Sequence, residues 1–332
     1  MKNKSKILVT GAAGFIGFHF AEYELKKGNI VIGVDNLNNY YDKKVKISRL
    51  NILKKYKNFI FFKMSLLDEN FYKSLKKYYN HIHCIVHLAG QAGVRHSIKY
   101  PEEYIKHNIL AYIKLLEFFK LSKKLKFIFY ASSSSVYGEK NSNEKSIILK
   151  NKPVSVYAAS KISMELISNV YSRLYNKNII GLRFFTVFGP WGRPDMSYFK
   201  FYNMALKNKT IEIFNYGNHS RSFTFIEDLI NNISKMKNYY LENFNKNRTE
   251  SNVYNLGNPR AESLKKMIEI MEKFHGKKFK KKYIKKQPGD VLKTKANIDI
   301  EVKKFKFKFM YSLNTGMEKF YLWYKNYKKE IS

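Results

Sequence analysis

Tyr157 and Lys161 are the residues of this sequence whose types and spacing most directly suggest chemistry. They stand four positions apart in Tyr157-Ala-Ala-Ser-Lys161, so on a helix both side chains lie on one face. An ammonium group close to a phenol stabilises the phenolate, and we expect Lys161 to lower the pKa of Tyr157 from its usual value of ~10. The sequence therefore predicts that Tyr157 acts as a general base.

A run of four serines precedes this pair, within Tyr130-Ala-Ser-Ser-Ser-Ser-Val-Tyr-Gly138. The run follows a predicted strand, and open α/β sheets bind ligands at the carboxyl ends of their strands. A hydroxyl at that place can share the reacting proton with Tyr157. We therefore expect residues 132–135 to line a ligand-binding crevice.

A glycine-rich turn follows the first predicted strand, in Gly11-Ala-Ala-Gly14-Phe-Ile-Gly17. Gly11 permits a tight turn, Gly14 lets the backbone approach a pyrophosphate, and Gly17 lets the next helix pack against the strand. The start of that helix supplies N–H donors and the positive end of its dipole. Asp35 ends the second strand, where a carboxylate binds an adenosine ribose and repels a 2′-phosphate, so the sequence favours NAD over NADP.

The alternation of residue patterns in the first half of the chain predicts a fold that brings these segments together. Apolar or β-branched runs alternate with amphipathic stretches, a pattern that predicts alternating strands and helices. We expect strands at residues 6–10, 30–35, 59–62, 84–87, 126–131 and 179–184, and helices near residues 15–27, 43–55, 71–79, 104–119 and 157–175. This alternation predicts an α/β protein with a Rossmann-type, doubly wound parallel sheet and helices on both faces.

The alternation breaks at Phe188-Gly-Pro-Trp-Gly-Arg-Pro194, where two prolines and two glycines prevent regular structure. We expect residues 1–188 to form the dinucleotide-binding domain, with residues 222–256 returning to its sheet. Residues 189–221 and 257–332 are expected to form a smaller, mixed α/β lobe that binds the substrate.

The composition describes a folded protein with a high positive charge. Of its 332 residues, 45% are hydrophobic and 16% aromatic, too many for a disordered chain. Lys+Arg 62 against Asp+Glu 26 gives a net charge of +36, which attracts nucleic acid and anionic lipid. The abundant Lys, Asn, Ile, Phe and Tyr share AT-rich codons, however, so base composition accounts for the charge without a partner. We expect neither nucleic acid nor a membrane as a partner.

The single cysteine, Cys84, predicts a reducing compartment, because it cannot form an internal disulfide and offers no pair of thiols for a structural zinc site. We expect Cys84 in the core and no metal site. No apolar run reaches the ~18 residues of a membrane span. Lys2, Lys4 and Lys6 with the apolar stretch after them are similar to a signal peptide, but the glycines of that stretch are placed for the phosphate-binding turn. We therefore expect a cytoplasmic protein.

The chain resembles the extended short-chain dehydrogenase/reductases that act on nucleotide sugars, through the glycine-rich turn, His87-Leu-Ala-Gly-Gln91, the serine run and Tyr157-Ala-Ala-Ser-Lys161. More narrowly, it resembles the UDP-glucuronate 4-epimerases over nearly its full length. The motifs that carry this narrower resemblance are Gln91-Ala-Gly-Val-Arg95, Arg183-Phe-Phe-Thr-Val-Phe-Gly-Pro-Trp-Gly-Arg-Pro-Asp-Met196, Arg221-Ser-Phe-Thr-Phe-Ile-Glu-Asp228 and Gln287-Pro-Gly-Asp-Val291.

The resemblance implies tightly held NAD and conversion of UDP-glucuronate to UDP-galacturonate through a transient 4-keto intermediate. It implies that Tyr157 takes the proton of the 4-hydroxyl, that Ser133 is the catalytic hydroxyl, and that Lys161 holds the ribose and tunes Tyr157. The cofactor-binding residues that it implies are Gly11, Ala13, Gly14, Phe15, Ile16, Gly17, Asp35, Asn36, Leu88, Ala89, Gln91, Asn108, Tyr157 and Lys161.

Ser134 and Ser135 distinguish the chain from related enzymes. The 4,6-dehydratases carry Asp-Glu at these two positions and the decarboxylases a glutamate at the second, whereas serine hydroxyls can donate to a uronate without repelling it. We expect Arg193 to pair with the sugar carboxylate, or alternatively to form a salt bridge between the lobes, and Thr186 to add a hydroxyl. The other substrate-binding residues implied by the resemblance are Ser133, Arg95, Arg221, Gln287 and Asp290.

Two positions depart from the family pattern. Ser65 stands where a family aspartate usually contacts adenine, so that hydrogen bond is lost or passes to Asp68 or another neighbour. Gly90 replaces a common alanine. These departures bear on NAD affinity and not on the type of reaction.

Two other kinds of function stay open from the sequence. Within the fold, the chain is alternatively a 4-epimerase of UDP-glucose or another nucleotide sugar, or a UDP-glucuronate decarboxylase. Outside it, a nucleic-acid-binding protein that has lost its chemistry is supported by charge alone. Members of the family commonly pair through two helices, and residues 104–119 and 156–175 carry the apolar residues for a four-helix bundle, so we expect a homodimer.

Overall fold

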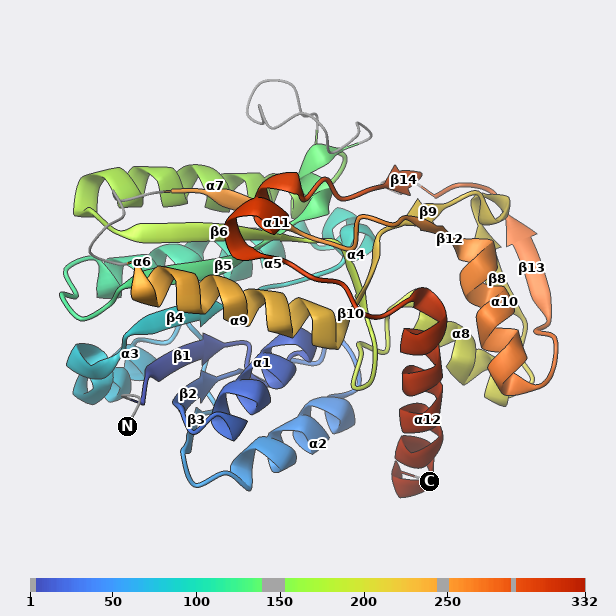
Figure 1. Ribbon diagram of the computed structural model, residues 1–332, viewed down its shortest axis with the longest axis horizontal. Helices are drawn as coiled ribbons and strands as arrows, with labels where there is room; N and C mark the ends of the chain where they lie inside the picture. The colour runs from blue at the N-terminus through green and yellow to red at the C-terminus, as the bar shows by residue number, and fades with distance from the viewer. Residues whose placement is uncertain (1–3, 139–152, 244–250, 288–290, 332) are drawn as a thin grey trace.

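Seven parallel strands form the central sheet of the protein, whose computed structural model describes residues 4–138, 153–243, 251–287 and 291–331. The strand order is β11-β6-β5-β4-β1-β2-β3 (Figure 1). The strands are β1 (Lys6–Thr10), β2 (Ile30–Val34), β3 (Phe59–Phe62), β4 (Cys84–His87), β5 (Phe127–Ser133), β6 (Asn178–Phe184) and β11 (Val253–Leu256). The prediction of a doubly wound parallel sheet is confirmed.

Two groups of helices cover the two faces of this sheet, because alternate residues of a strand point to opposite sides. Ile7 and Val9 of β1 pack on one side together with Cys84, which is buried as expected, and Leu8 packs on the other. The first side is covered by α1 (Phe15–Lys26), α2 (Lys43–Lys54) and α9 (Ile226–Glu242), and the second by α3 (Glu69–Leu75), α6 (Ala111–Phe119) and α7 (Val156–Tyr175). Figure 1 shows α7 and α9 on opposite sides of the sheet.

The remaining elements are short or lie beside the sheet. The helices among them are α4 (Val94–Lys99), α5 (Pro101–Tyr104), α8 (Ser197–Leu206), α10 (Leu264–His275), α11 (Asp299–Phe305) and α12 (Leu313–Ile331). Short 3-10 or π-helical segments are η1 (Lys76–His81), η2 (Ile105–Leu110), η3 (Ser134–Tyr137) and η4 (Asn215–Gly217). Three small sheets pair β7 (Thr186–Phe188) with β10 (Phe223–Phe225), β8 (Ile211–Phe214) with β13 (Lys281–Ile284), and β9 (Ser220–Arg221) with both β12 (Glu262–Ser263) and β14 (Lys293–Thr294).

Figure 1 places α8, α10, β8 and β13 together at one end of the molecule, away from the large sheet. The strand β11 pairs with β6 and so brings residues 253–256 back to that sheet. This pairing supports the expected division of the chain into a sheet domain and a smaller lobe, whose exact boundaries stay a prediction.

Two expected elements differ in detail from those observed. The strand β5 continues through Ser132 and Ser133, which pair with Arg183 and Phe184 of β6, so these serines end the strand instead of following it. The single helix expected at residues 104–119 is interrupted by η2, a π-helical turn. Such turns are rare and are frequently found at functional sites, and this one carries the buried Asn108.

The direction of the chain through the sheet reverses at β1. From β1 the chain runs outward through β2 to β3 and then returns to β4, on the other side of β1. Open α/β sheets bind ligands at this switch point, outside the carboxyl ends of the two strands. Thr10 of β1 pairs with His87 of β4, so the glycine-rich turn and Leu88 leave the sheet side by side at this place.

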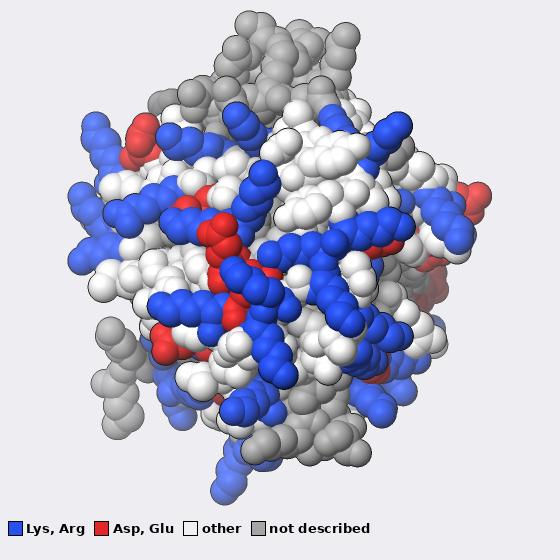
Figure 2. Space-filling view, turned by 90° about the vertical axis from the view of Figure 1, so that its right-hand side faces the viewer, with Lys and Arg blue, Asp and Glu red and all other residues white. Residues whose placement is uncertain are grey.

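The positive charge is not gathered in one patch on the face of the protein that Figure 2 shows. Lys and Arg side chains are spread over much of this face, with Asp and Glu side chains among them. In the part of the chain that the structure describes, no helix has both the length and the apolar character needed to cross a membrane. The distribution on this face agrees with an effect of composition and does not mark one anionic partner.

Candidate active site

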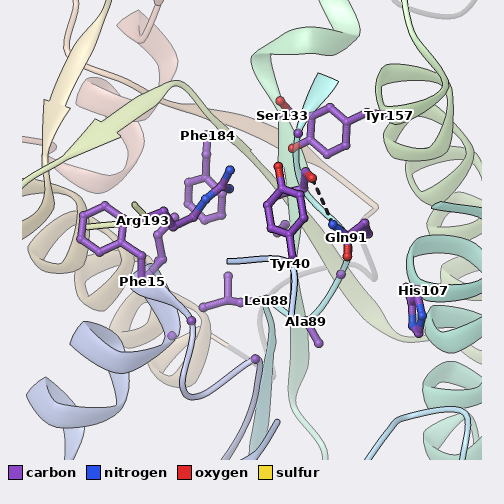
Figure 3. A pocket seen from close by; sticks show the side chains of 18 of the residues that line it. Phe15, Tyr40, Leu88, Ala89, Gln91, His107, Ser133, Tyr157, Phe184 and Arg193 are labelled. Atoms are coloured by element: carbon purple, nitrogen blue, oxygen red, sulfur yellow. Dashed lines mark hydrogen bonds between the residues drawn. The ribbon is translucent and has the colours of Figure 1, made fainter. Parts of the chain in front are cut away.

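A cavity of ≈ 460 Å³ opens at the switch point of the sheet, within the range that small-molecule ligands occupy. Seventeen of the residues expected at the site line it (Figure 3): Gly11, Gly14, Phe15, Ile16, Gly17, Asp35, Asn36, Leu88, Ala89, Gln91, Ser133, Ser134, Ser135, Tyr157, Lys161, Thr186 and Arg193. The structure therefore brings the expected cofactor-binding and catalytic residues together in one place.

Gly11 and Gly17 of the glycine-rich turn have no room for a side chain. Gly11 has a φ of +70°, and a Cβ there would lie 2.8 Å from the backbone nitrogen of Ala89. A Cβ on Gly17 would lie 2.1 Å from the carbonyl oxygen of Gly11. Gly14 precedes α1 without a side-chain cap, so the first N–H groups of this helix face the cavity and can bind an anion. This cradle fits the pyrophosphate of a dinucleotide.

Asp35 lies at the end of the cavity where an adenosine ribose is expected. Its Oδ2 accepts a hydrogen bond from the backbone N–H of Ala13 at 3.0 Å, and its Oδ1 accepts one from that of Leu37 at 2.8 Å. Ala13 thus acts through its backbone and does not line the cavity. Lys46 also lines this end, but its Nζ donates to the carbonyl and Oδ1 oxygens of Asn38, at 3.0 and 2.7 Å. Asp35 accordingly keeps lone pairs for ribose hydroxyls.

Asn108 supports the cavity wall by binding the backbone of Gln91. Its Oδ1 accepts a hydrogen bond from the backbone N–H of Gln91 at 2.6 Å, and its Nδ2 donates to the carbonyl of Gln91 at 3.1 Å and to Ser160 Oγ at 2.9 Å. Asn108 is fully buried and does not line the cavity. It therefore links the segment after β4 to the helix α7 that carries Tyr157.

Tyr157 and Ser133 lie next to each other at one end of the cavity (Figure 3). The pKa of Tyr157 is raised, not lowered as expected from Lys161, because burial of the phenol dominates. The hydrogen bond with Ser133 and the positive charge of Arg193 lower the pKa of Tyr157 but do not cancel the effect of burial. Lys161 Nζ lies 5.9 Å from the centre of the Tyr157 ring. Ser133 and Arg193 are thus the groups that favour the phenolate of Tyr157, a role expected for Lys161.

Lys161 is a buried ammonium group with few partners. Burial lowers its pKa to about 8. Among the described residues, its Nζ donates to Met164 Sδ at 3.6 Å, and a thioether is a weak acceptor. The side chain is 4% exposed and lines the cavity. A buried donor in this state fits the hydroxyls of a nucleotide ribose.

We expect Lys161→Met to stabilise the protein by about 3 kcal/mol at pH 7, because the buried ammonium of Lys161 is costly. In the unfolded chain the lysine titrates near 10.5 and in the folded protein at about 8, so between these pH values the unfolded chain binds more protons. The stability of the wild type therefore rises with pH in this window, and the advantage of Lys161→Met shrinks toward pH 10.5. Urea denaturation at several pH values measures both effects.

Lys237→Met is the matched control for this prediction. Lys237 is also buried, but its Nζ pairs with Glu24 Oε2 at 2.5 Å. Its removal leaves a buried carboxylate unpaired and is expected to destabilise the protein by about 3–5 kcal/mol. Equal destabilisation by both variants would show that Lys161 is paired in solution.

Arg193 enters the cavity from the wall opposite Tyr157, with Tyr40 between it and Gln91 (Figure 3). It pairs with Asp195, which accepts from Arg193 Nε at 3.0 Å and from its Nη2 at 2.5 Å. Tyr40 donates a hydrogen bond to the same carboxylate at 3.2 Å. Burial alone would lower the pKa of Arg193, but the Asp195 carboxylate raises it, so Arg193 stays charged. The salt bridge that the structure shows for Arg193 is therefore with Asp195 of the same loop and not between the lobes, and Arg193 also lines the cavity.

Ser132, the first residue of the serine run, lines the cavity, and its hydroxyl is bound to Glu165. Its Oγ donates to Glu165 Oε1 at 2.5 Å, and Glu165 in turn accepts from Arg183 Nε at 2.8 Å and from Nη2 at 2.7 Å. Glu165 stands on α7 two turns beyond Tyr157, and Arg183 stands on β6. This buried ion pair fixes the end of β5 against the helix that carries the phenol.

Three of the described residues expected around the nucleotide, Arg95, Arg221 and Gln287, do not line the cavity. Arg95 lies over the ring of Phe214, 4.2 Å from its centre. Arg221 donates to the backbone carbonyls of Val291 and Leu292. Gln287 is half-buried, and Asp290 lies outside the described residues. Their roles toward a substrate stay predictions.

Asp68, one of the residues expected to take over the hydrogen bond to adenine, lies outside the cavity wall. This residue caps α3, with its Oδ1 accepting from the backbone N–H of Asn70 at 2.9 Å, and it does not line the cavity. Ser65 does line the cavity, between Met64 and Leu66. A hydroxyl therefore stands where the family carries a carboxylate.

Sequence reasoning missed part of the cavity wall. The residues missed include Asn38, Tyr40, Tyr41, Lys46, His107 and Met196. The first four follow the carboxyl end of β2, so the rule that selected the serine run could have found them. His107 and Met196 carry no comparable local signal, because they reach the cavity through the packing of distant segments.

The fold and the cavity define an enzyme that holds a dinucleotide at the switch point of its sheet and carries a Ser, Tyr and Lys set beside it. Residues 7–257 match the NAD dependent epimerase/dehydratase family. Protein CapI of Staphylococcus aureus is 41% identical, over 98% of this chain and 100% of that protein. UDP-glucuronate 4-epimerase 4 of Arabidopsis thaliana is 38% identical, over 98% of this chain and 76% of that protein.

A solved structure shows the same similarity. The UDP-glucuronic acid 4-epimerase of Bacillus cereus, in complex with UDP-glucuronic acid and NAD, superposes with a TM-score of 0.88 at 33% identity, over 97% of this chain and 99% of that one. The chain belongs to the NAD dependent epimerase/dehydratase family.

Proposed function

We propose that the protein is an isomerase that converts UDP-glucuronate to UDP-galacturonate at C4, with NAD as its cofactor. The observation that carries this proposal is that Arg193 lines the same cavity as Tyr157 and Ser133, while Ser134 and Ser135 add no carboxylate. The similar proteins from Arabidopsis thaliana and Bacillus cereus are UDP-glucuronate 4-epimerases by name.

The residues that hold NAD in this proposal run along the cavity from the adenosine end to the reacting end. Asp35 accepts from the ribose hydroxyls, the turn at Gly11 to Gly17 cradles the pyrophosphate, and Lys161 donates to the second ribose. When bound, NAD supplies a positively charged hydride acceptor that takes hydrogen from C4 and returns it.

Tyr157 and Ser133 handle the proton in this proposal. Tyr157 receives the proton of the 4-hydroxyl as hydrogen leaves C4, and gives it back when the hydrogen returns. Burial raises the pKa of Tyr157, so proton transfer depends on the groups that favour the phenolate, the hydroxyl of Ser133 and the charge of Arg193. The two side chains share one hydrogen bond, which keeps the proton within reach of the sugar oxygen.

Arg193 recognises the carboxylate of the sugar. Two of its N–H groups are used by Asp195, and a guanidinium has five, so donors remain for a second carboxylate. Thr186 and the hydroxyls of Ser134 and Ser135 line the same cavity. A 4-keto uronate is a β-keto acid and loses carbon dioxide readily, so holding the carboxylate in one orientation protects the intermediate.

A neutral-sugar epimerase is the second candidate, and one observation favours it. Because Asp195 already neutralises Arg193, the cavity can take a sugar without a carboxylate. Decarboxylation has less support, because Ser135 stands where decarboxylases of this fold carry a glutamate. The two candidates differ in substrate and not in the chemistry at C4.

Proton NMR of the purified protein with UDP-glucuronate and NAD tests the proposal. We expect signals of the galacto isomer to appear and to reach an equilibrium mixture. Deuterium placed at C4 should stay on the sugar, since the hydrogen leaves and returns without exchange. A UDP-pentose or an unchanged spectrum would contradict the proposal, and turnover of UDP-glucose alone would favour the second candidate.

We also propose that the protein is a cytoplasmic homodimer whose product feeds polysaccharide synthesis. Three large apolar residues form an exposed stripe on α7 at a spacing of four: Leu166, 39% exposed, Val170, 52%, and Leu174, 69%. Ile105 and Leu110 add exposed apolar side chains on η2, which packs against α7. Such a stripe is typical of a helix that pairs with a second copy. The free Cys84 fits a reducing compartment.

We expect the double substitution Val170→Lys and Leu174→Lys to weaken the dimer by about 100-fold or more, because it places like charges and buried ammonium groups in the interface. Light scattering during gel filtration measures the mass of the particle. Leu322→Lys is the control, since Leu322 is 56% exposed on α12, outside the stripe. A dimer that survives the double substitution, or one that Leu322→Lys breaks, would place the interface elsewhere.

A further inference from the structure

Three consecutive backbone carbonyls just before Arg193 are held by side chains from the other half of the molecule. His19 on α1 donates its ring N–H, on Nε2, to the carbonyl of Pro190 at 2.9 Å. Arg49 on α2 donates from Nη2 to the carbonyls of Trp191 at 2.5 Å and Gly192 at 3.0 Å. The loop that presents Arg193 to the cavity is therefore fixed to α1 and α2, which lie on one face of the large sheet.

Arg49 also holds the glycine-rich turn itself. Its Nη1 donates to the carbonyl of Ala13 at 2.9 Å and to the hydroxyl of Tyr41 at 2.9 Å. The side chain is fully buried, and these four acceptors are all neutral oxygens. A planar, forked guanidinium can reach four such acceptors at once, whereas an ammonium on a flexible stem cannot.

The backbone that these donors hold is strained. Trp191 has a φ of +57°, which side-chain-bearing residues rarely adopt. Such a conformation persists only where the surroundings determine it. The carbonyls of Trp191 and of its two neighbours are fixed by hydrogen bonds, and the Trp191 ring packs against Trp323, with 5.1 Å between the ring centres. The direction in which the next side chain, Arg193, leaves the loop follows from this geometry.

We propose that His19 and Arg49 are positioning residues that set the place of Arg193 in the sugar site, so that recognition of a substrate carboxylate depends on a clamp built from the cofactor-binding half. This inference rests on the proposed function, in which Arg193 meets that carboxylate. His19 acts as a hydrogen-bond donor and not through a positive charge. Burial lowers the pKa of His19 to about 4, so its ring is neutral at pH 7 and keeps one N–H for Pro190.

A double-mutant cycle between Arg49 and Arg193 tests the clamp. We expect Arg49→Lys to lower kcat/KM for UDP-glucuronate by about 10-fold, mainly through KM, at saturating NAD. In the Arg193→Ala background the same substitution should change kcat/KM by less than about 2-fold, because the residue it positions is gone. The dissociation constant of UDP-glucuronate, measured by calorimetry, should follow the same pattern.

His19 provides a second pair of variants with a built-in control. His19→Phe keeps a ring but removes the donor and is expected to raise KM for UDP-glucuronate by about 5-fold. His19→Gln keeps an N–H donor and should stay within about 2-fold of the wild type. Thermal unfolding of each variant shows whether it folds. If Arg49→Lys does not fold, the two His19 variants still test the clamp.

The clamp and the proposed function are overturned by different results. A wild type that does not interconvert UDP-glucuronate and UDP-galacturonate overturns the proposed function. An active wild type in which Arg49→Lys is equally harmful with and without Arg193 overturns the clamp alone. Equal losses in His19→Phe and His19→Gln overturn it as well, because the hydrogen bond to Pro190 would then have no effect on substrate binding.

Discussion

Tyr157→Phe is expected to lower kcat for UDP-glucuronate by about 1,000-fold or more, because the reaction loses the group that receives and returns the proton of the 4-hydroxyl. The substitution removes one oxygen atom and keeps the ring, whose centre lies 6.0 Å from that of Tyr104. The shape of the cavity and the packing of α7 should therefore not change. Initial rates of UDP-galacturonate formation, measured by NMR or chromatography, give the ratio.

The binding of substrate and cofactor is the control for this experiment. Tyr157→Phe should bind UDP-glucuronate and NAD within a few-fold of the wild type, since the phenol oxygen acts on the proton and not on the UDP group. Ser133→Ala should lower kcat less, by about 10- to 100-fold, because the phenol remains and loses only its hydrogen-bond partner. A Tyr157→Phe variant that keeps a tenth of the wild-type rate would show that another group is the base.

The parts of the site that the sequence predicts are those that local backbone geometry determines. The turn at Gly11 to Gly17 is fixed by glycines with no space for a Cβ, and that requirement is visible in the residue types. Asp35 follows one buried strand and the serine run stands at the carboxyl end of another, so their meeting at one edge of the sheet follows from parallel strand order. The strands of the first half of the chain are predicted within two residues at each end for the same reason.

The parts that the sequence does not predict depend on contacts between distant segments. Tyr40 reaches Asp195 across 155 positions of the chain, and Arg49 reaches Trp191 across 142. No local pattern marks either pair, because hydrogen bonds to carbonyls and carboxylates need only a donor at the right place. The π-helical turn that carries Asn108 is hidden for a similar reason, since its residues read as an ordinary helix.

The pKa of Tyr157 is another property that the local sequence does not predict. Its spacing from Lys161 correctly places both groups in one cavity, but the direction of the pKa shift depends on how deeply the phenol is buried and on what else is near. Burial is a property of the assembled fold, and Arg193 comes from a loop that follows β7. The spacing of two residues on one helix cannot supply that information.

Arg193→Ala is expected to lower kcat/KM for UDP-glucuronate by about 100- to 1,000-fold, and that for UDP-glucose far less. Two effects combine in this prediction. The sugar carboxylate loses its charged partner, and the loss of one partner of a hydrogen-bonded charge pair that the ligand buries costs about 2–5 kcal/mol. In addition, Asp195 loses the guanidinium that holds its pKa low, and an unpaired carboxylate beside the sugar repels the uronate.

The second effect can be separated from the first by a further substitution. Arg193→Ala combined with Asp195→Asn removes the repelling carboxylate, so we expect it to recover about 10-fold of the lost kcat/KM for UDP-glucuronate. UDP-glucose has no carboxylate, and its turnover should not improve when Asp195 is neutralised. Steady-state rates of the two variants with both sugars measure this difference. Equal losses for both sugars in Arg193→Ala would mean that Arg193 supports the loop, and that the carboxylate is recognised by Thr186 and the serine hydroxyls instead.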